Sequence, residues 1–226
     1  SVIRSFFFAP ANRHDLLAKF PRFNADCTVI DLEDGTPPAE KESARARLAK
    51  AVRMLREAKL QSRLMVRVNE PSSKHYLRDL ESAFESDVDG VVIPKLEQRD
   101  QLFPALHIIG RLEREIPNGR TRSVLGGIES IGGVMNVEAL VGIDPHMDAI
   151  FFGAEDFMSE MGGRRTPLGH EVLYARSRVV LAARSRQLIA LDQAVTEIRD
   201  DEQFTRDAEL GRDLGYNGKI CLLPRQ

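Results

Sequence analysis

Short apolar segments alternate with longer amphipathic segments along the whole chain, and this alternation constrains the fold more than any other feature. About eight segments have the length and apolar character of buried strands, and a helical pattern follows each of them except the last. Such alternation predicts a parallel sheet, and eight such units predict a closed (β/α)₈ TIM barrel. An open doubly wound sheet is the alternative. The expected strands lie at about residues 5–8, 27–33, 64–68, 90–94, 123–129, 149–153, 188–194 and 219–223.

The expected helices connect these strands without any low-complexity linker, so we expect one barrel domain over residues 1–226. The chain reaches Gln226 just after the eighth strand. We therefore expect the closing C-terminal helix, and any lid that follows it, to be absent from this chain. The helices begin near residue 14 and then lie at about residues 39–58, 76–84, 99–115, 133–140, 172–186 and 202–214.

Charge and composition exclude several classes of function. A formal net charge of -2 gives no reason to expect nucleic acid or an anionic membrane as a partner. No apolar run approaches the roughly 20 residues that span a bilayer, and no secretory signal is visible at the N-terminus. Cys27 and Cys221 are far apart and form no metal-type pair, which favours a reducing cytoplasm as the location.

Carboxylates end two of the apolar strands. Glu129 follows the strand at about 123–129, and Asp156 follows the strand at about 149–153. A buried carboxylate is costly unless it is paired or binds a cation, although each residue alone could also cap a helix or join a salt bridge. As a pair on neighbouring strands they predict two ligands of one Mg²⁺ ion, with water and substrate completing the octahedron. The scattered histidines show no zinc spacing.

Arg67 lies within an apolar strand, where alternation places Met65, Arg67 and Asn69 on one face. A buried arginine requires an anion, which is either Glu33 or Asp34 or a substrate carboxylate; we favour the substrate, because the guanidinium suits bidentate recognition. Glu33 and Asp34 are then expected to hold Arg67 or metal-bound water. We interpret Asp31 as a satisfied barrel carboxylate outside the site.

Small residues precede Asp156. Gly153 and Ala154, with Glu155 beside them, leave backbone N–H groups that could hold a substrate carboxylate. Lys95 also ends a strand, and is either solvated or a substrate contact. The arginines of residues 176–186 are expected on a solvated or subunit-facing surface.

Several motifs, in order along nearly the whole chain, resemble the citrate lyase β-subunit family of the HpcH/HpaI aldolase superfamily of acyl-CoA lyases. Two departures from the family pattern are Ala11, where glycine is usual before Asn-Arg, and Leu222-Leu223-Pro224, where Ile-His-Pro is usual. The motifs that carry the resemblance lie at residues 7–13, 29–35, 66–69, 92–95, 152–156, 174–178, 218–219 and 224–226.

The resemblance implies a TIM barrel that binds Mg²⁺ and cleaves or forms a carbon–carbon bond in a 3-hydroxyacyl-CoA. It implies that Glu129 and Asp156 bind the metal and that Arg67 contacts the oxo-acid. It places Asn12 and Arg13 near the coenzyme A portion. It also implies a homotrimer or a larger homo-oligomer.

The function that we predict is a Mg²⁺-dependent retro-Claisen lyase acting on citryl-, malyl- or citramalyl-CoA, which gives an oxo-acid and acetyl-CoA. Arg67, with Glu33 and Asp34, forms the expected catalytic set. Two alternatives are a catalytically weak subunit that binds acyl-CoA or oxo-acid within a larger complex, and a class II aldolase that does not use coenzyme A.

Overall fold

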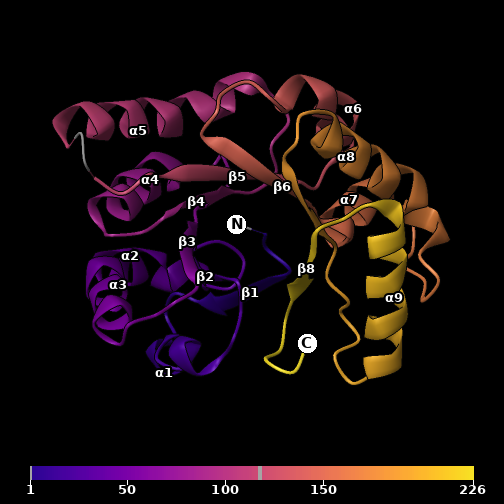
Figure 1. The fold of residues 1–226 in the computed structure, drawn as a ribbon, viewed down its shortest axis with the longest axis horizontal. Helices are drawn as coiled ribbons and strands as arrows, with labels where there is room; N and C mark the ends of the chain where they lie inside the picture. Colours follow the sequence, from indigo (N-terminus) through magenta and orange to yellow (C-terminus); the bar gives the residue numbers. More distant parts are fainter. Residues whose placement is uncertain (1, 117–118) are drawn as a thin grey trace.

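Eight parallel strands close into a barrel in the computed structural model, which describes residues 2–116 and 119–226 (Figure 1). Each strand pairs with the next, and β8 pairs with β1. The closed barrel is confirmed and the open sheet is excluded. The strands are β1 Ser5–Pro10, β2 Cys27–Asp31, β3 Arg63–Arg67, β4 Gly90–Ile93, β5 Ser123–Ile128, β6 Met147–Phe152, β7 Ile189–Asp192 and β8 Gly218–Cys221.

Helices surround the barrel, and one of them, α7 at Ala154–Met161, was not expected from the sequence. Its signals are present: Glu155 and Asp156 lie in its first turn, and Gly162 ends it in the left-handed conformation. No helix within residues 2–116 and 119–226 is long and apolar enough to span a membrane. The other helices are α1 His14–Leu17, η1 Phe20–Arg22, η2 Pro38–Glu40, α2 Lys41–Ala46, α3 Leu48–Glu57, α4 Tyr76–Glu85, η3 Arg99–Leu102, α5 Phe103–Glu115, α6 Ile131–Leu140, η4 His170–Val172, α8 Leu173–Ser185 and α9 Asp201–Leu214.

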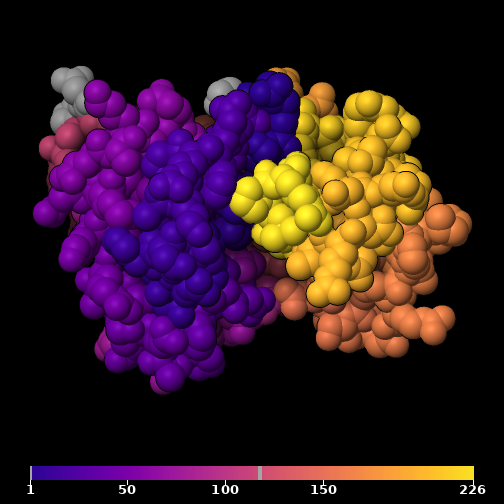
Figure 2. All heavy atoms as spheres, turned by 90° about the horizontal axis from the view of Figure 1, so that it is seen from below, coloured from indigo at the N-terminus to yellow at the C-terminus, as the bar shows by residue number. Residues whose placement is uncertain are grey.

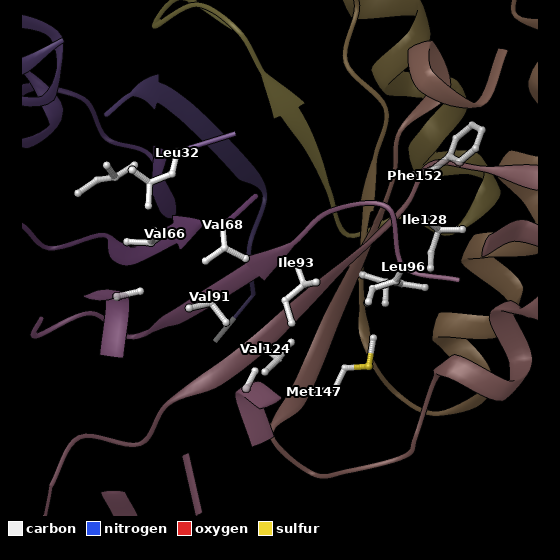
Figure 3. Close-up of a cluster of buried hydrophobic side chains, with 14 of the residues drawn as sticks. Leu32, Val66, Val68, Val91, Ile93, Leu96, Val124, Ile128, Met147 and Phe152 are labelled. Carbon is white, nitrogen blue, oxygen red and sulfur yellow. The ribbon is translucent and has the colours of Figure 1, made fainter. Parts of the chain in front are cut away.

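Strand alternation divides the core into two layers. One set of side chains fills the barrel interior and includes Phe6, Val29, Met65, Leu125 and Phe151. The other set packs between the strands and the helices. Figure 3 shows this outer layer, with labelled side chains that belong to it at Leu32, Val66, Val68, Val91, Ile93, Leu96, Val124, Ile128, Met147 and Phe152.

The two ends of the chain meet where the barrel closes. Figure 2 shows the indigo N-terminal part beside the yellow C-terminal part. Phe6 of β1 is the register partner of Ile220 of β8, and both side chains enter the interior layer. Because all eight strands run in parallel, their C-terminal ends surround one mouth.

A buried ion cluster joins α8, β7, β8 and α9, and it corrects the expectation for Arg176, one of the arginines of residues 176–186 that were expected on a solvated or subunit-facing surface. Arg176 is fully buried. It donates to Asp192 from Nε (2.8 Å) and to Asp207 from Nη1 (3.1 Å), and Nζ of Lys219 reaches both carboxylates. Asp192 and Lys219 point out of the barrel toward the helices, so Arg176 anchors α8 and α9 to the strands.

Candidate active site

Two adjoining cavities meet at the carboxylate pair at the mouth of the barrel. The first has a volume of about 400 Å³ and the second about 380 Å³, and Glu129 and Asp156 line both. The second cavity also holds Glu70, Lys95 and Glu160. The first cavity is the one that Arg67 reaches, and its walls are Phe8, Ala9, Pro10, Asp31, Asp34, Gly35, Arg67, Glu129, Phe151, Gly153, Ala154, Glu155, Asp156, Ala194, Thr196, Ile220 and Leu222.

Glu129 directly follows β5, and the backbone around it is fitted to its carboxylate. The backbone N–H of Lys95 donates to Oε1 at 3.1 Å. A Cβ on Gly127 would lie 2.5 Å from Oε1, and a Cβ on Gly153 would lie 2.5 Å from Oε2. Glycine is therefore required on both sides of this side chain.

The charge of Glu129 is only partly compensated by the protein. Its side chain is 4% exposed, and it forms no ion pair with any lysine or arginine among the described residues. Burial raises the pKa of Glu129 to about 8; Arg67 opposes this shift, and the carboxylates of Glu33 and Asp156 add to it. A cation held between Glu129 and Asp156 would remove this cost.

Asp156 comes from α7, and not from the end of β6 as the sequence suggested, because β6 stops at Phe152. Over residues 2–116 and 119–226, no group of three or more His, Cys, Asp and Glu side chains is arranged to hold a metal. Two carboxylates remain, with open cavity on both sides of them. This donor set fits Mg²⁺, which uses few protein oxygens and keeps water or substrate at its other positions.

Arg67 ends β3 and is held on three sides. Nε and Nη2 donate to the two oxygens of Asp31 at 2.7 and 2.6 Å, Nη1 lies 3.2 Å from Oε2 of Glu33, and the guanidinium lies 5.0 Å from the centre of the Phe8 ring. Burial alone would lower the pKa of Arg67, but the negative charges of Asp31 and Glu33 outweigh burial and raise it. Arg67 lines the first cavity, and its remaining N–H groups are donors for a ligand there.

Asp31 is a satisfied carboxylate, as expected, but it also lines the first cavity, which the sequence interpretation did not anticipate. Burial opposes its charged form, but Arg67 and the N–H groups of Glu33 and Gly35 outweigh burial and lower its pKa. A signal was available, because Cys27, Val29 and Asp31 alternate on the inward face of β2.

Glu33 lies between two cations. Its carboxylate contacts Nη1 of Arg67 at 3.2 Å and Nζ of Lys95 at 3.2 Å. Burial raises the pKa of Glu33, and these cations offset only part of the effect.

Asp34 is exposed and lines the first cavity. Lys95 is not a solvated strand end, since Nζ is also 3.8 Å from Glu70.

The backbone at the start of α7 differs in one respect from the expectation. The N–H of Gly153 donates to the carbonyl of Ile128 at 3.0 Å, so it is not free for a ligand. Ala154 and Glu155 lie in the first turn of α7, where N–H groups have no intrahelical partner. The carboxylate of Glu155 pairs with Arg165 at 2.9 Å.

Three residues expected at or near the mouth do not line the first cavity. Asn12 donates to Glu40 at 2.9 Å and Arg13 pairs with Asp15 at 2.8 Å, and neither lines the first cavity. Asn69 lies beyond the end of β3, so alternation no longer applies to it. It donates to the buried carboxylate of Asp79 on α4 at 2.6 Å and to the carbonyl of Leu32 at 3.0 Å. This contact ties the end of β2 to that of β3.

Known proteins are similar to this chain in sequence and in fold. The family model described as HpcH/HpaI aldolase/citrate lyase matches residues 4–224. The chain is 42% identical over 228 aligned positions to the citrate lyase subunit beta-like protein of Deinococcus radiodurans, covering 100% of this chain and 78% of that protein. It is 29% identical to the mitochondrial citramalyl-CoA lyase of Homo sapiens, covering 99% of this chain and 68% of that protein.

A solved structure has the same fold. It is the citrate lyase beta subunit from M. tuberculosis complexed with oxaloacetate and magnesium. It superposes with a TM-score of 0.80 at 28% sequence identity, covering 100% of this chain and 94% of that chain.

Proposed function

Because the chain belongs to the HpcH/HpaI aldolase/citrate lyase family, we propose that it is a Mg²⁺-dependent carbon–carbon lyase acting on a short 3-hydroxyacyl-CoA. Candidate substrates are citryl-, malyl- and citramalyl-CoA, which would give acetyl-CoA and oxaloacetate, glyoxylate or pyruvate. The observation that carries the proposal is that Glu129, Asp156 and Arg67 line one cavity at the mouth of the barrel.

The relatives support each part of this proposal. One is named citramalyl-CoA lyase, which is a carbon–carbon lyase acting on a coenzyme A thioester. Another was solved with magnesium and the oxo-acid oxaloacetate. The lyase class and the use of Mg²⁺ with a coenzyme A thioester follow from this family, while the acyl group is our inference.

Glu129 and Asp156 are the residues that would hold the metal. A bound Mg²⁺ would act as a Lewis acid toward the carboxylate and hydroxyl oxygens of the acyl group. Gly127, Gly153 and the N–H of Lys95 fix the Glu129 carboxylate before any ligand arrives. Such preorganisation avoids rearrangement during the reaction.

Arg67 would bind the carboxylate of the oxo-acid portion. Asp31 and Glu33 hold its guanidinium in place, and Arg67 lines the cavity. The N–H groups of Ala154 and Glu155 offer a second set of donors. Phe8, Ile220 and Leu222 give part of this cavity an apolar surface, suited to the thioester arm.

Cleavage breaks the bond between C2 and C3 of the acyl group. The 3-hydroxyl loses its proton, and its oxygen becomes the carbonyl oxygen of the oxo-acid. The bonding electron pair passes to the thioester as an enolate, which then takes a proton at carbon to give acetyl-CoA. Asp34 lines the cavity and forms no ion pair among the described residues, and with Glu33 it completes the catalytic set that we propose.

The test is an acetyl-CoA release assay with each of the three thioesters, with and without Mg²⁺. We expect turnover only with Mg²⁺, and we expect Glu129→Gln and Asp156→Asn to lower it about 100-fold or more. Glu115→Gln, an exposed acid on α5, is the matched control and should keep full activity. Full turnover by both site variants would refute the ligand assignment.

One observation favours a second function, a subunit that binds acyl-CoA without rapid turnover. Leu223 stands after β8 where the histidine of Ile-His-Pro is usual in the family, next to Leu222, which lines the first cavity. Calorimetry with acetyl-CoA and oxaloacetate separates the two functions. Tight binding without turnover of any thioester supports the second, whereas cleavage of a free hydroxy acid without coenzyme A supports an aldolase.

A homotrimer or larger homo-oligomer also belongs to the proposal. Met135 of α6 and Tyr174 and Leu181 of α8 are 58%, 72% and 70% exposed. Arg178 links Met135 and Tyr174, since it donates to the carbonyl of Met135 and to the hydroxyl of Tyr174. We expect Leu181→Arg to lower the mass measured by light scattering to that of a monomer.

The buried, free thiols of Cys27 and Cys221 suit the cytoplasm as the location.

A further inference from the structure

Lys95 has a backbone conformation that a residue with a side chain rarely adopts. Its φ angle is 51°, in the left-handed region. Within residues 2–116 and 119–226, the other non-glycine residues with positive φ are Lys59 and Gln187. Of the three, only Lys95 lines a cavity at the mouth of the barrel. Strain of this kind persists only where the surroundings impose it, and it concentrates at functional sites.

The left-handed turn directs two successive N–H groups of the chain toward β5. The N–H of Lys95 donates to Oε1 of Glu129 at 3.1 Å, and the N–H of Leu96 donates to the carbonyl of Gly127 at 2.9 Å. These bonds hold the segment after β4 against the end of β5. With Oε1 bound in this way and Gly153 leaving room at Oε2, the carboxylate has one orientation.

The ammonium group of Lys95 does not contact Glu129 and instead forms ion pairs with other carboxylates. Nζ lies 3.2 Å from Glu33 and 3.8 Å from Glu70. A positive charge beside a cation site repels the cation, so the side chain itself does not favour metal binding.

We propose that Lys95 is a positioning residue for the metal ligand Glu129, and that it acts through its left-handed backbone N–H and not through its ammonium group. The inference rests on the proposed function only in taking Glu129 as a metal ligand. Any residue that tolerates the left-handed conformation can then replace Lys95 without loss of metal affinity.

Three substitutions at position 95 separate the effect of the backbone conformation from the effect of the side-chain charge. Lys95→Gly removes the charge and favours the left-handed conformation, Lys95→Met removes the charge and tolerates it, and Lys95→Val removes the charge and disfavours it. The probe is Mn²⁺, with free ion counted by electron paramagnetic resonance on metal-stripped protein. We expect the Gly and Met variants to bind Mn²⁺ as tightly as the unmodified protein or more tightly. We expect the Val variant to bind Mn²⁺ about tenfold more weakly, because it loses one hydrogen bond to a charged group.

The matched control is Lys59→Val. Lys59 has the same left-handed conformation (φ 55°) at the end of α3, remote from the site. This variant should be destabilised similarly with unchanged affinity for Mn²⁺. Equal affinity among the three variants at position 95, or equal weakening by Lys59→Val, would overturn the proposal.

A second measurement does not depend on the folding of Lys95→Val. In the ¹⁵N-labelled, metal-free protein, the Lys95 amide resonance should shift more on Glu129→Gln than the amides of residues 97 and 98 do. An unchanged Lys95 amide would contradict the proposal. If the unmodified protein binds no Mn²⁺ while the amide shift is observed, the metal assignment in the proposed function fails and the positioning contact stands.

Discussion

Asp31 and Arg67 are register partners at the last positions of β2 and β3, and their side chains form a two-bond ion pair inside the mouth of the barrel. The pair fixes the plane of the guanidinium, with Phe8 below it and Glu33 beside it. The cation that faces the ligand cavity is therefore oriented by the protein before a ligand binds, which is the arrangement that favours electrostatic stabilisation of a transition state.

Asp31→Asn should destabilise the protein strongly, because it leaves the buried charge of Arg67 with less compensation. We expect a loss of about 3 kcal/mol in the free energy of unfolding, measured by urea denaturation. Asp15→Asn removes the partner of Arg13 in an exposed pair and should change stability very little. Equal effects of the two variants on the free energy of unfolding would contradict the prediction that the buried pair contributes more to stability than the exposed pair.

Glu129→Gln should raise the thermal stability of the metal-free protein at pH 7.5 while abolishing its stabilisation by Mg²⁺. Glutamine keeps an oxygen for the N–H of Lys95 but removes a buried charge. Thermal unfolding with and without Mg²⁺ measures both effects. A variant that is less stable than the unmodified protein without metal would contradict the view that this carboxylate is only partly compensated.

Gly153→Ala should weaken metal binding without preventing folding of the barrel. The added Cβ would lie 2.5 Å from Oε2 of Glu129, so the carboxylate must turn away from its present orientation. We expect Mn²⁺ affinity to fall about tenfold or more, by analogy with the loss of a residue that orients a metal ligand. Gly110→Ala is the control, because its Cβ would meet nothing closer than 3.6 Å, within α5. It should leave affinity unchanged and slightly raise stability.

His146 should make stability depend on pH. Partial burial would lower its pKa, but the carboxylates of Glu113 and Asp144, at 2.9 and 2.6 Å, outweigh burial and raise it. A raised folded-state pKa contributes stability that is complete below about pH 6.5, the usual value, and is lost as pH rises through the folded-state pKa.

The contribution of His146 should reach at most about 1 kcal/mol, since the groups are partly exposed. Urea denaturation should therefore show a larger difference between the unmodified protein and His146→Gln at pH 5.5 than at pH 8.5. A difference that is the same at both values, or larger at pH 8.5, would contradict the assignment.

Much of the fold was predictable because it depends on local patterns. Each strand is a short apolar run, and each clear helix repeats its apolar residues at helical spacing, so neighbouring residues are enough to identify them. The helix α7 was not predicted, because its first turn carries Glu155 and Asp156, which also suit the end of a strand. The position of Glu129 after β5 was likewise readable from the chain.

The roles of the charged residues at the mouth were less predictable. Strand alternation placed Arg67 correctly on the inner face, but it could not name Asp31 as the partner in place of Asp34. It also placed Asn69 on that face, although β3 had already ended. Alternation along one strand contains no information about which residue of the next strand lies opposite.

The order of apolar and polar residues along the chain was thus sufficient for a closed parallel barrel whose strand ends carry acids and an arginine. Only the packed structure decided which of these groups touch, since Asp31 and Arg67 are brought together by the register of two strands. The same holds for Glu129, whose orientation depends on close approach of Gly153 and on the left-handed turn at Lys95. Contacts between segments far apart in the chain arise from register and packing, and neither is written in any local stretch of residues.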